Sequence, residues 1–266
     1  MSVEFKLLGP IQVVVDGEPV TPSSRMQRVL LAVLMLQANR TVTIERLKEI
    51  LWDRPPASSH ANLRTHISFV RKALRRHGED RMIRQLGGYR LEVMPGELDL
   101  DEFRRMAARG RSLVAVDDLA GGCRALGQAV ALGRGPAGSC LNAEGQLADQ
   151  LAALNTERLQ VFEEWIDIRL QLGEASAVVG AVHAHVADHP TREYAWGQLM
   201  RATYYAGDVA AALRAFSQAR HMLVGQLGIE PGQQLRSLQR AILDRDEAVL
   251  EPRRFRRPGT LAMGTR

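Results

Sequence analysis

Residues 58–76 read SSHANLRTHISFVRKALRR, and the rest of the chain is organised around them. At helical spacing the apolar positions of this stretch form a single stripe, Leu63, Ile67, Val70 and Leu74. The remaining positions are mostly basic or hydrogen-bonding, and no acidic residue lies between Asp53 and Glu79. The pattern predicts an amphipathic helix with a basic, polar outward face. Such a face suits the major groove of DNA, although the helix taken alone equally fits a solvated basic helix on an ordinary core.

The segments on either side of this helix predict a small α+β domain. The expected elements are strands at 3–8 and 11–15, helices at 25–38 and 43–51, and a hairpin formed by the runs 82–86 and 89–93. Gly87-Gly88 separates the two runs of the hairpin and is explained by turn geometry. A sheet, three helices and a terminal hairpin follow the order of a winged helix-turn-helix, whose third helix enters the major groove.

Helix geometry assigns roles to the polar positions of the third helix. We expect three side chains to face base edges: Asn62, Thr65 and Phe69. We expect five others to face mainly phosphates: Arg64, His66, Arg71, Lys72 and Arg75. Ser68 shares a strip with Arg64 and can also hydrogen-bond to bases, while Arg84 and Gln85 of the wing extend toward the minor groove. Arg75, near the far end of the helix, also fits a solvated surface charge.

The second part of the chain is predicted to be entirely helical. Pro95-Gly96 marks a joint between a domain at 1–96 and a helical domain at 97–250, and residues 251–266 are predicted to be a basic disordered tail. The Gly173-Glu174 and Gly207-Asp208 steps lie 34 residues apart, and each precedes an alanine-rich helix. A 34-residue helix–turn–helix period is typical of tetratricopeptide (TPR) repeats, so this domain is expected to be a TPR-like array.

Composition separates the two domains further and limits the function. The 266-residue chain carries a net charge of +5 with 45% hydrophobic residues. Residues 1–97 contain 15 basic and 10 acidic side chains, whereas residues 98–250 contain 15 basic and 19 acidic ones. Two cysteines, Cys123 and Cys140, form neither a metal-ligand spacing nor a disulfide framework. The absence of a signal peptide and of a long apolar run predicts a cytoplasmic protein without a membrane partner.

No motif in the sequence indicates an enzyme or a bound cofactor. A phosphate-binding G-x-x-x-x-G-K-[ST] loop is lacking. His183 and His185 point to different faces of a helix, and His185 and His189 share a face without nearby cysteine or carboxylate support, so no metal site is expected. The adjacent carboxylates Glu163 and Glu164 are interpreted as a solvated helix surface, and nothing identifies Cys140 as a nucleophile.

Several segments resemble a known family. FKLLGPIQVVVDGEPV (5–20), LRTHISFVRKAL (63–74) and IRQLGGYRLEV (83–93) resemble the winged-helix domain of OmpR-type transcription factors, and more closely the SARP-type antibiotic-pathway activators of actinomycetes. ELDLDEF (97–103), RGPAGSCL (134–141) and LGIEPGQQLRSLQRAIL (227–243) resemble the bacterial transcriptional activation domain that follows it in that family. The resemblance covers residues 3–250 in the family's domain order. It departs from the family at Phe69, where OmpR-type helices often carry arginine, and at Gly133, where a tryptophan is usual.

The resemblance implies a pathway-specific transcriptional activator of antibiotic biosynthesis. It also implies that the loop before the third helix, with Trp52, Asp53 and Arg54, faces the sigma subunit of RNA polymerase, although Trp52 equally fits a cap on the domain core. Phe69 cannot pair with guanine, and either contacts a thymine methyl group or folds back onto the core. We expect a homodimer on direct repeats beside a promoter, with the helical domain joining the copies. The alternatives are a repressor, a ligand-sensing or scaffold helical-repeat protein, and the front part of a longer regulator.

Overall fold

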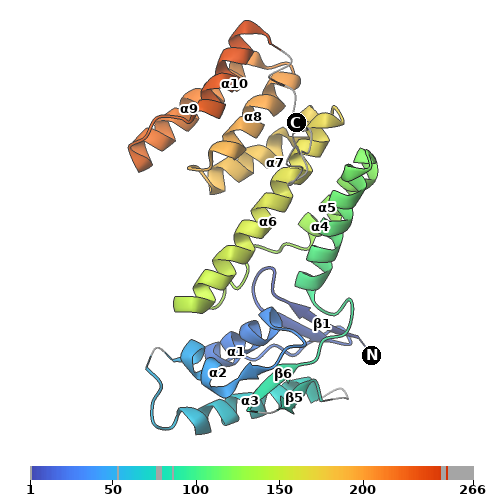
Figure 1. Cartoon of the computed structure of the whole chain (residues 1–266), viewed down its shortest axis with the longest axis vertical. Helices are drawn as coiled ribbons and strands as arrows, with labels where there is room; N and C mark the ends of the chain where they lie inside the picture. The colour runs from blue at the N-terminus through green and yellow to red at the C-terminus, as the bar shows by residue number, and fades with distance from the viewer. Residues whose placement is uncertain (1, 53, 76–79, 86, 247–249, 251–266) are drawn as a thin grey trace, which may run out of the picture. The chain divides into compact units, whose positions relative to one another are not determined.

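A computed structural model of the chain describes residues 2–52, 54–75, 80–85, 87–246 and 250 (Figure 1). Residue contacts divide the chain into two compact units. The first, here the N-terminal unit, comprises Met1–Ala107 and Gln128–Leu159, and the second, the helical unit, comprises Ala108–Gly127 and Gln160–Arg266. The N-terminal unit thus continues past the joint expected at residue 96. The predicted tail, 251–266, lies outside the described residues.

Two small antiparallel sheets form the β-structure of the N-terminal unit. The first sheet has the strand order β1 (Val3–Lys6), β2 (Gln12–Val15) and β3 (Glu18–Pro19). The second has the order β4 (Val42–Thr43), β6 (Gly88–Leu91) and β5 (Met82–Gln85). Strands β3 and β4 were not predicted from sequence, because a strand of two residues is too short to show an alternating pattern.

Three helices build the core of this unit: α1 (Arg25–Leu36), α2 (Ile44–Leu51) and α3 (Ser59–Arg75). Helix α1 packs against both α2 and α3. The apolar stripe predicted for α3 is confirmed, since Leu63, Ile67, Val70 and Leu74 are each at most 5% exposed. Thr43 caps α2, because its Oγ1 accepts a hydrogen bond from the backbone N–H of Arg46 at 3.2 Å.

The predicted hairpin is confirmed as β5 and β6, with one change in the role of its glycines. Gly87 has a φ of +73°, a conformation that favours glycine in a turn. Gly88 instead begins β6 and pairs with Thr43 of β4. A Cβ atom on Gly88 would lie 2.3 Å from the carbonyl oxygen of Val42. The second glycine is therefore required by the close approach of β4 rather than by the turn.

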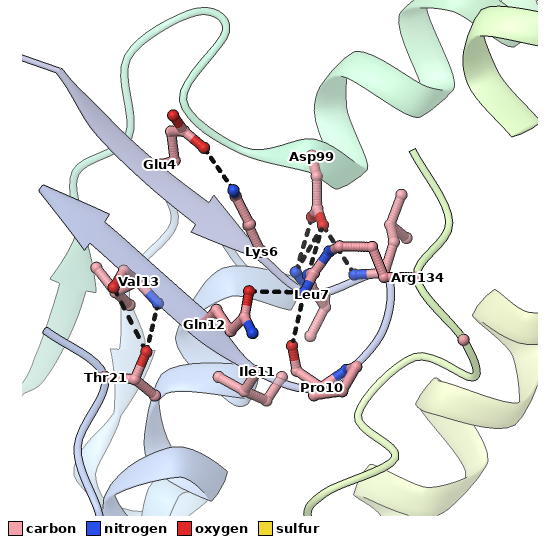
Figure 2. A network of polar contacts seen from close by, with 12 residues as sticks. Glu4, Lys6, Leu7, Pro10, Ile11, Gln12, Val13, Thr21, Asp99 and Arg134 are labelled. Atoms are coloured by element: carbon pink, nitrogen blue, oxygen red, sulfur yellow. Dashed lines mark hydrogen bonds and ion pairs between the residues drawn. The ribbon is translucent and has the colours of Figure 1, made fainter. Parts of the chain in front are cut away.

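Residues beyond 96 are tied to the first sheet by a polar network (Figure 2). The carboxylate of Asp99 accepts hydrogen bonds from the backbone N–H groups of Leu7 at 2.8 Å and Leu8 at 3.0 Å. Arg134 lies beside it, 3.5 Å from Asp99 Oδ2, and donates to Gln12 Oε1 at 2.9 Å. Because these contacts join residues 99 and 134 to β2 and to the segment that follows β1, the compact unit extends past the wing.

Helices make up the rest of the described chain. They are α4 (Asp99–Ala115), α5 (Leu119–Ala131), α6 (Gly145–Gln171), α7 (Ala175–Asp188), α8 (Glu193–Tyr205), α9 (Val209–Leu227) and α10 (Gln233–Asp244). In the helical unit, α8 packs against α7 and α9, and α10 packs against α8 and α9. Gly173 and Gly207, 34 residues apart, both have positive φ values and precede α7 and α9. This repetition matches the predicted TPR-like period.

A buried polar cluster in the helical unit corrects one expectation. Glu163, interpreted from sequence as solvated, is only 5% exposed. Its carboxylate receives a hydrogen bond from Arg192 Nη2 at 2.8 Å and lies 3.1 Å from His185 Nε2. Burial alone would favour the neutral acid, but these two partners hold the pKa of Glu163 below its usual value. The neighbouring Glu164 is more exposed and pairs with Arg111 at 2.8 Å.

The predicted fold class is confirmed: small antiparallel sheets and a winged helix-turn-helix are followed by a helical domain. Among the described residues, no helix is both long and apolar enough to cross a membrane.

Candidate nucleic-acid interface

The face of α3 opposite the buried stripe is open to solvent. Six of the residues predicted to bind DNA are exposed there: Asn62, Arg64, Thr65, Ser68, Phe69 and Lys72. These exposed residues are interspersed with the buried ones in the sequence, because residues three and four apart lie on the same side of a helix. The apolar face of α3 therefore packs on α1, and the opposite face presents donors, acceptors and cations to solvent.

The polar groups of this face have few internal partners. Thr65 Oγ1 donates to the carbonyl oxygen of Ala61 at 3.1 Å, and Asn62 Nδ2 donates to Ser58 Oγ at 3.3 Å. Both side chains retain acceptor capacity toward an outside ligand. Within the described part of the chain, Arg64 and Lys72 form no ion pair. A surface with unneutralised cations beside free acceptors is the arrangement that phosphate and base-edge contacts require.

Arg71 differs from the other predicted phosphate ligands. Its Nη2 donates to the carbonyl oxygen of Met82 at 2.8 Å, and its Nε lies 3.3 Å from Asp80 Oδ2. Met82 begins β5, so the guanidinium connects α3 to the wing. The structure thus places Arg71 in a positioning role, which the sequence did not reveal because its main acceptor is a backbone carbonyl.

His66 also lies off the open face. Its ring is half-buried, with its centroid 6.3 Å from that of Trp52. Burial lowers the pKa of His66, so the neutral imidazole is favoured and its attraction to phosphate is weak near neutral pH. Trp52, at the C-cap of α2, is half-buried as well, whereas Arg54 in the following loop is exposed. Asp53 lies outside the described residues.

The wing carries the last two predicted contacts. Arg84 and Gln85 are both exposed near the end of β5. Gln85 Oε1 accepts a hydrogen bond from Thr41 Oγ1 at 2.8 Å, which holds the wing beside the segment preceding α2. Thr41 was not predicted as part of this site, since a lone threonine 44 residues from its partner carries no recognisable signal in the sequence. For Arg75 the structure describes the backbone at the end of α3 and not the side chain.

A winged helix whose third helix exposes a basic, hydrogen-bonding face defines the class of DNA-binding transcription regulators. Comparison with family models agrees. The model described as "Transcriptional regulatory protein, C terminal" matches residues 17–91, and the "Bacterial transcriptional activator domain" matches residues 98–243. The chain belongs to the SARP-type family of transcriptional activators, as the resemblance implied.

Individual relatives give the same result. The chain is 32% identical over 256 residues to "Regulatory protein DnrI" of Streptomyces peucetius, covering 93% of this chain and 94% of that protein. It is 32% identical to "Regulatory protein AfsR" of Streptomyces griseus over 94% of this chain, but spans only 26% of that longer protein. A solved structure of Mycobacterium tuberculosis EmbR with a low-affinity phosphopeptide matches with a TM-score of 0.84 and 31% identity. That match covers 91% of this chain and 65% of the EmbR chain.

Proposed function

We propose that this protein activates transcription of a secondary-metabolite gene cluster by binding direct repeats beside a promoter and recruiting RNA polymerase. The observation that carries the proposal is the acid-free helix α3, which buries one face and exposes the other. The relation to DnrI supports a regulatory role, because that protein is a regulatory protein and the match covers 94% of its length.

In the proposed complex α3 lies in the major groove and the wing follows the adjacent backbone. Asn62 and Thr65 contact base edges, since amide and hydroxyl groups can hydrogen-bond there. Arg64 and Lys72 contact phosphates, where a cation gains affinity on any sequence. Arg84 extends from β5 toward the minor groove or its phosphates.

Two copies would bind side by side on direct repeats. Half-sites separated by about one helical turn, roughly 10–10.5 base pairs, place both α3 helices on the same side of the duplex. In this proposal the domain at 97–250 joins the copies, and the loop from Trp52 to Ala57 meets the sigma subunit. The exposed guanidinium of Arg54 is the clearest described candidate for that contact.

Selection of bound duplexes from a random DNA pool with the purified protein tests the proposal. The expected result is a repeated motif with a spacing of about one turn. Transcription from a template carrying that motif should rise when the protein is added to RNA polymerase holoenzyme. A pool without enriched sequence would contradict specific DNA binding, and a fall in transcript would make the protein a repressor.

The polymerase contact has a test of its own. Arg54→Ala should leave affinity for the selected DNA unchanged and lower transcription, because Arg54 belongs to the loop before α3 and not to the helix itself. Arg84→Ala is the matched control. Because Arg84 is a wing arginine assigned to DNA, its removal should lower the affinity for DNA, and transcription should fall as a consequence. Equal transcription by wild type and Arg54→Ala would remove this arginine from the proposed sigma contact.

A second candidate function, ligand sensing, is favoured by one feature of the helical unit. A groove of about 570 Å³ lies among α7, α8 and α9, and its lining includes His183, Pro190, Trp196, Gln218, His221 and Met222. Its volume suits a small molecule, and its lining contains two imidazoles and no carboxylate. We therefore expect an aromatic anion such as 1-anilinonaphthalene-8-sulfonate to bind there. Calorimetry with Gln218→Trp, which fills the groove, should lose this binding, while Leu227→Trp on the same helix should keep it.

A further inference from the structure

Phe69 is the exposed aromatic side chain on the open face of α3. It is 56% exposed, while its neighbours on that face, Thr65, Ser68 and Lys72, are polar. The buried side of the helix is already filled by the stripe that begins at Leu63, each member of which is at most 5% exposed. Folding back onto the core therefore does not account for Phe69, and its ring remains available to a partner.

The position of Phe69 along the helix identifies the partner. It lies four residues after Thr65 and seven after Asn62, so the three side chains follow one strip of the helix. Asn62 and Thr65 are the residues assigned to base edges in the proposed complex. If α3 enters the major groove, the ring of Phe69 lies among base edges and not among phosphates.

We propose that Phe69 reads thymine at one position of each half-site through contact between its ring and the thymine C5-methyl group. This inference rests on the proposed function of α3. A phenyl ring neither donates nor accepts a conventional hydrogen bond, so it cannot pair with the amino, carbonyl or ring-nitrogen groups of the major groove. The thymine methyl is the apolar group of an unmodified base pair that is exposed there. An arginine at this position would instead favour guanine.

Deoxyuridine provides the sharpest test, because it keeps the hydrogen-bonding edge of thymidine and lacks the methyl group. Each thymine of the selected operator is replaced in turn, and affinity is measured at constant salt. At one thymine per half-site, replacement should weaken wild-type binding about fourfold, the effect of removing one methyl group from apolar contact. Replacement elsewhere should change affinity little.

Variants assign the effect to Phe69. Phe69→Ala should bind thymine DNA about fourfold less tightly than wild type and should no longer distinguish thymine from uracil at that position. Ser68→Ala is the matched control on the next exposed residue, and it should keep the wild-type response to uracil. Phe69→Arg should shift the base selected at that position from thymine to guanine. The thermal unfolding of Phe69→Ala should match that of wild type, since the side chain is exposed.

The outcomes separate this inference from the proposed function. Specific binding by wild type without any response to uracil overturns the methyl contact and leaves the proposed function intact. An unchanged response to uracil in Phe69→Ala also overturns it, because another side chain would then contact the methyl group. If the wild-type protein shows no sequence preference at all, the proposed function is contradicted, and the inference about Phe69 is contradicted with it.

Discussion

Several arginines of the helical unit and the two cations on the open face of α3 differ in whether a carboxylate of the chain pairs with them. In the helical unit Arg111, Arg192 and Arg220 each pair with a carboxylate of a neighbouring segment, with donor–acceptor distances of 2.6 to 2.8 Å. On α3 of the N-terminal unit, Arg64 and Lys72 have no such carboxylate within the described ranges. Basic side chains therefore connect neighbouring segments in the helical unit, whereas these two on the open face of α3 remain available to an outside anion.

The difference follows from where acidic residues occur and not from the number of basic ones. Residues 98–250 contain as many basic residues as residues 1–97, but nearly twice as many acidic ones. An acid-free segment contains no carboxylate of its own to pair with its cations, and on α3 only Arg71, which reaches Asp80 beyond the segment, has one within reach among the described residues. The comparison gives four predictions, beginning with the largest expected effect.

The largest effect should come from the buried carboxylate of the helical unit. Glu163→Ala leaves Arg192 and His185 without their shared partner and should lower the free energy of unfolding by about 3 kcal/mol. Glu164→Ala removes the adjacent, more exposed carboxylate and should cost less than about 1 kcal/mol. Urea unfolding followed by tryptophan fluorescence measures both. Equal losses of unfolding free energy in the two variants would contradict the prediction that the buried glutamate contributes more to stability than the more exposed one.

This pair also shows what sequence can and cannot predict. The buried stripe of α3 was predictable because helical periodicity is a local pattern, and the same holds for the helices of the second domain. The burial of Glu163 was not predictable, since its partners lie 22 and 29 residues away and Glu163 and Glu164 look alike in sequence. Long-range polar contacts depend on how helices pack, which no short window of sequence contains.

The next effect concerns base preference on the open face of α3. Asn62→Ala or Thr65→Ala should each relax the preference at one operator position by about 1–3 kcal/mol, because each removes a hydrogen-bonding group assigned to a base edge. Competition binding with single-base variants of the selected operator measures this. Matching preferences in wild type and both variants would contradict their base-facing assignment.

A smaller effect should come from the phosphate-facing cations. Lys72→Ala should weaken binding on all sequences alike and reduce the slope of log affinity against log salt by about one unit. Arg220→Ala, in the helical unit, removes an arginine already paired with Glu230 and should leave that slope unchanged. A similar reduction of the salt slope in both variants would show that paired arginines also contact DNA. It would contradict the distinction between paired and unpaired basic residues.

The candidate site was predicted from sequence more completely for the residues that point outward than for those that support them. Exposed positions of α3 follow from the stripe, so Asn62, Thr65 and Lys72 could be placed on its open side. Arg71 and His66 flank the stripe, where helical periodicity leaves the direction of a side chain undecided. Their contacts with Met82 and Trp52 depend on how α3 meets the wing and α2, which only the folded structure shows.

The smallest effect is expected for His66. Burial lowers its pKa, so at pH 7.5 the ring is neutral and His66→Gln should change the salt slope less than Lys72→Ala does. The histidine should act on stability instead. Because the pKa is lower in the folded than in the unfolded state, the unfolded chain binds the proton more readily. Wild-type stability should therefore fall as the pH drops below about 6.5, and His66→Gln should remove that part of the fall. A salt slope that drops by a full unit in His66→Gln would instead place a charged imidazole on a phosphate.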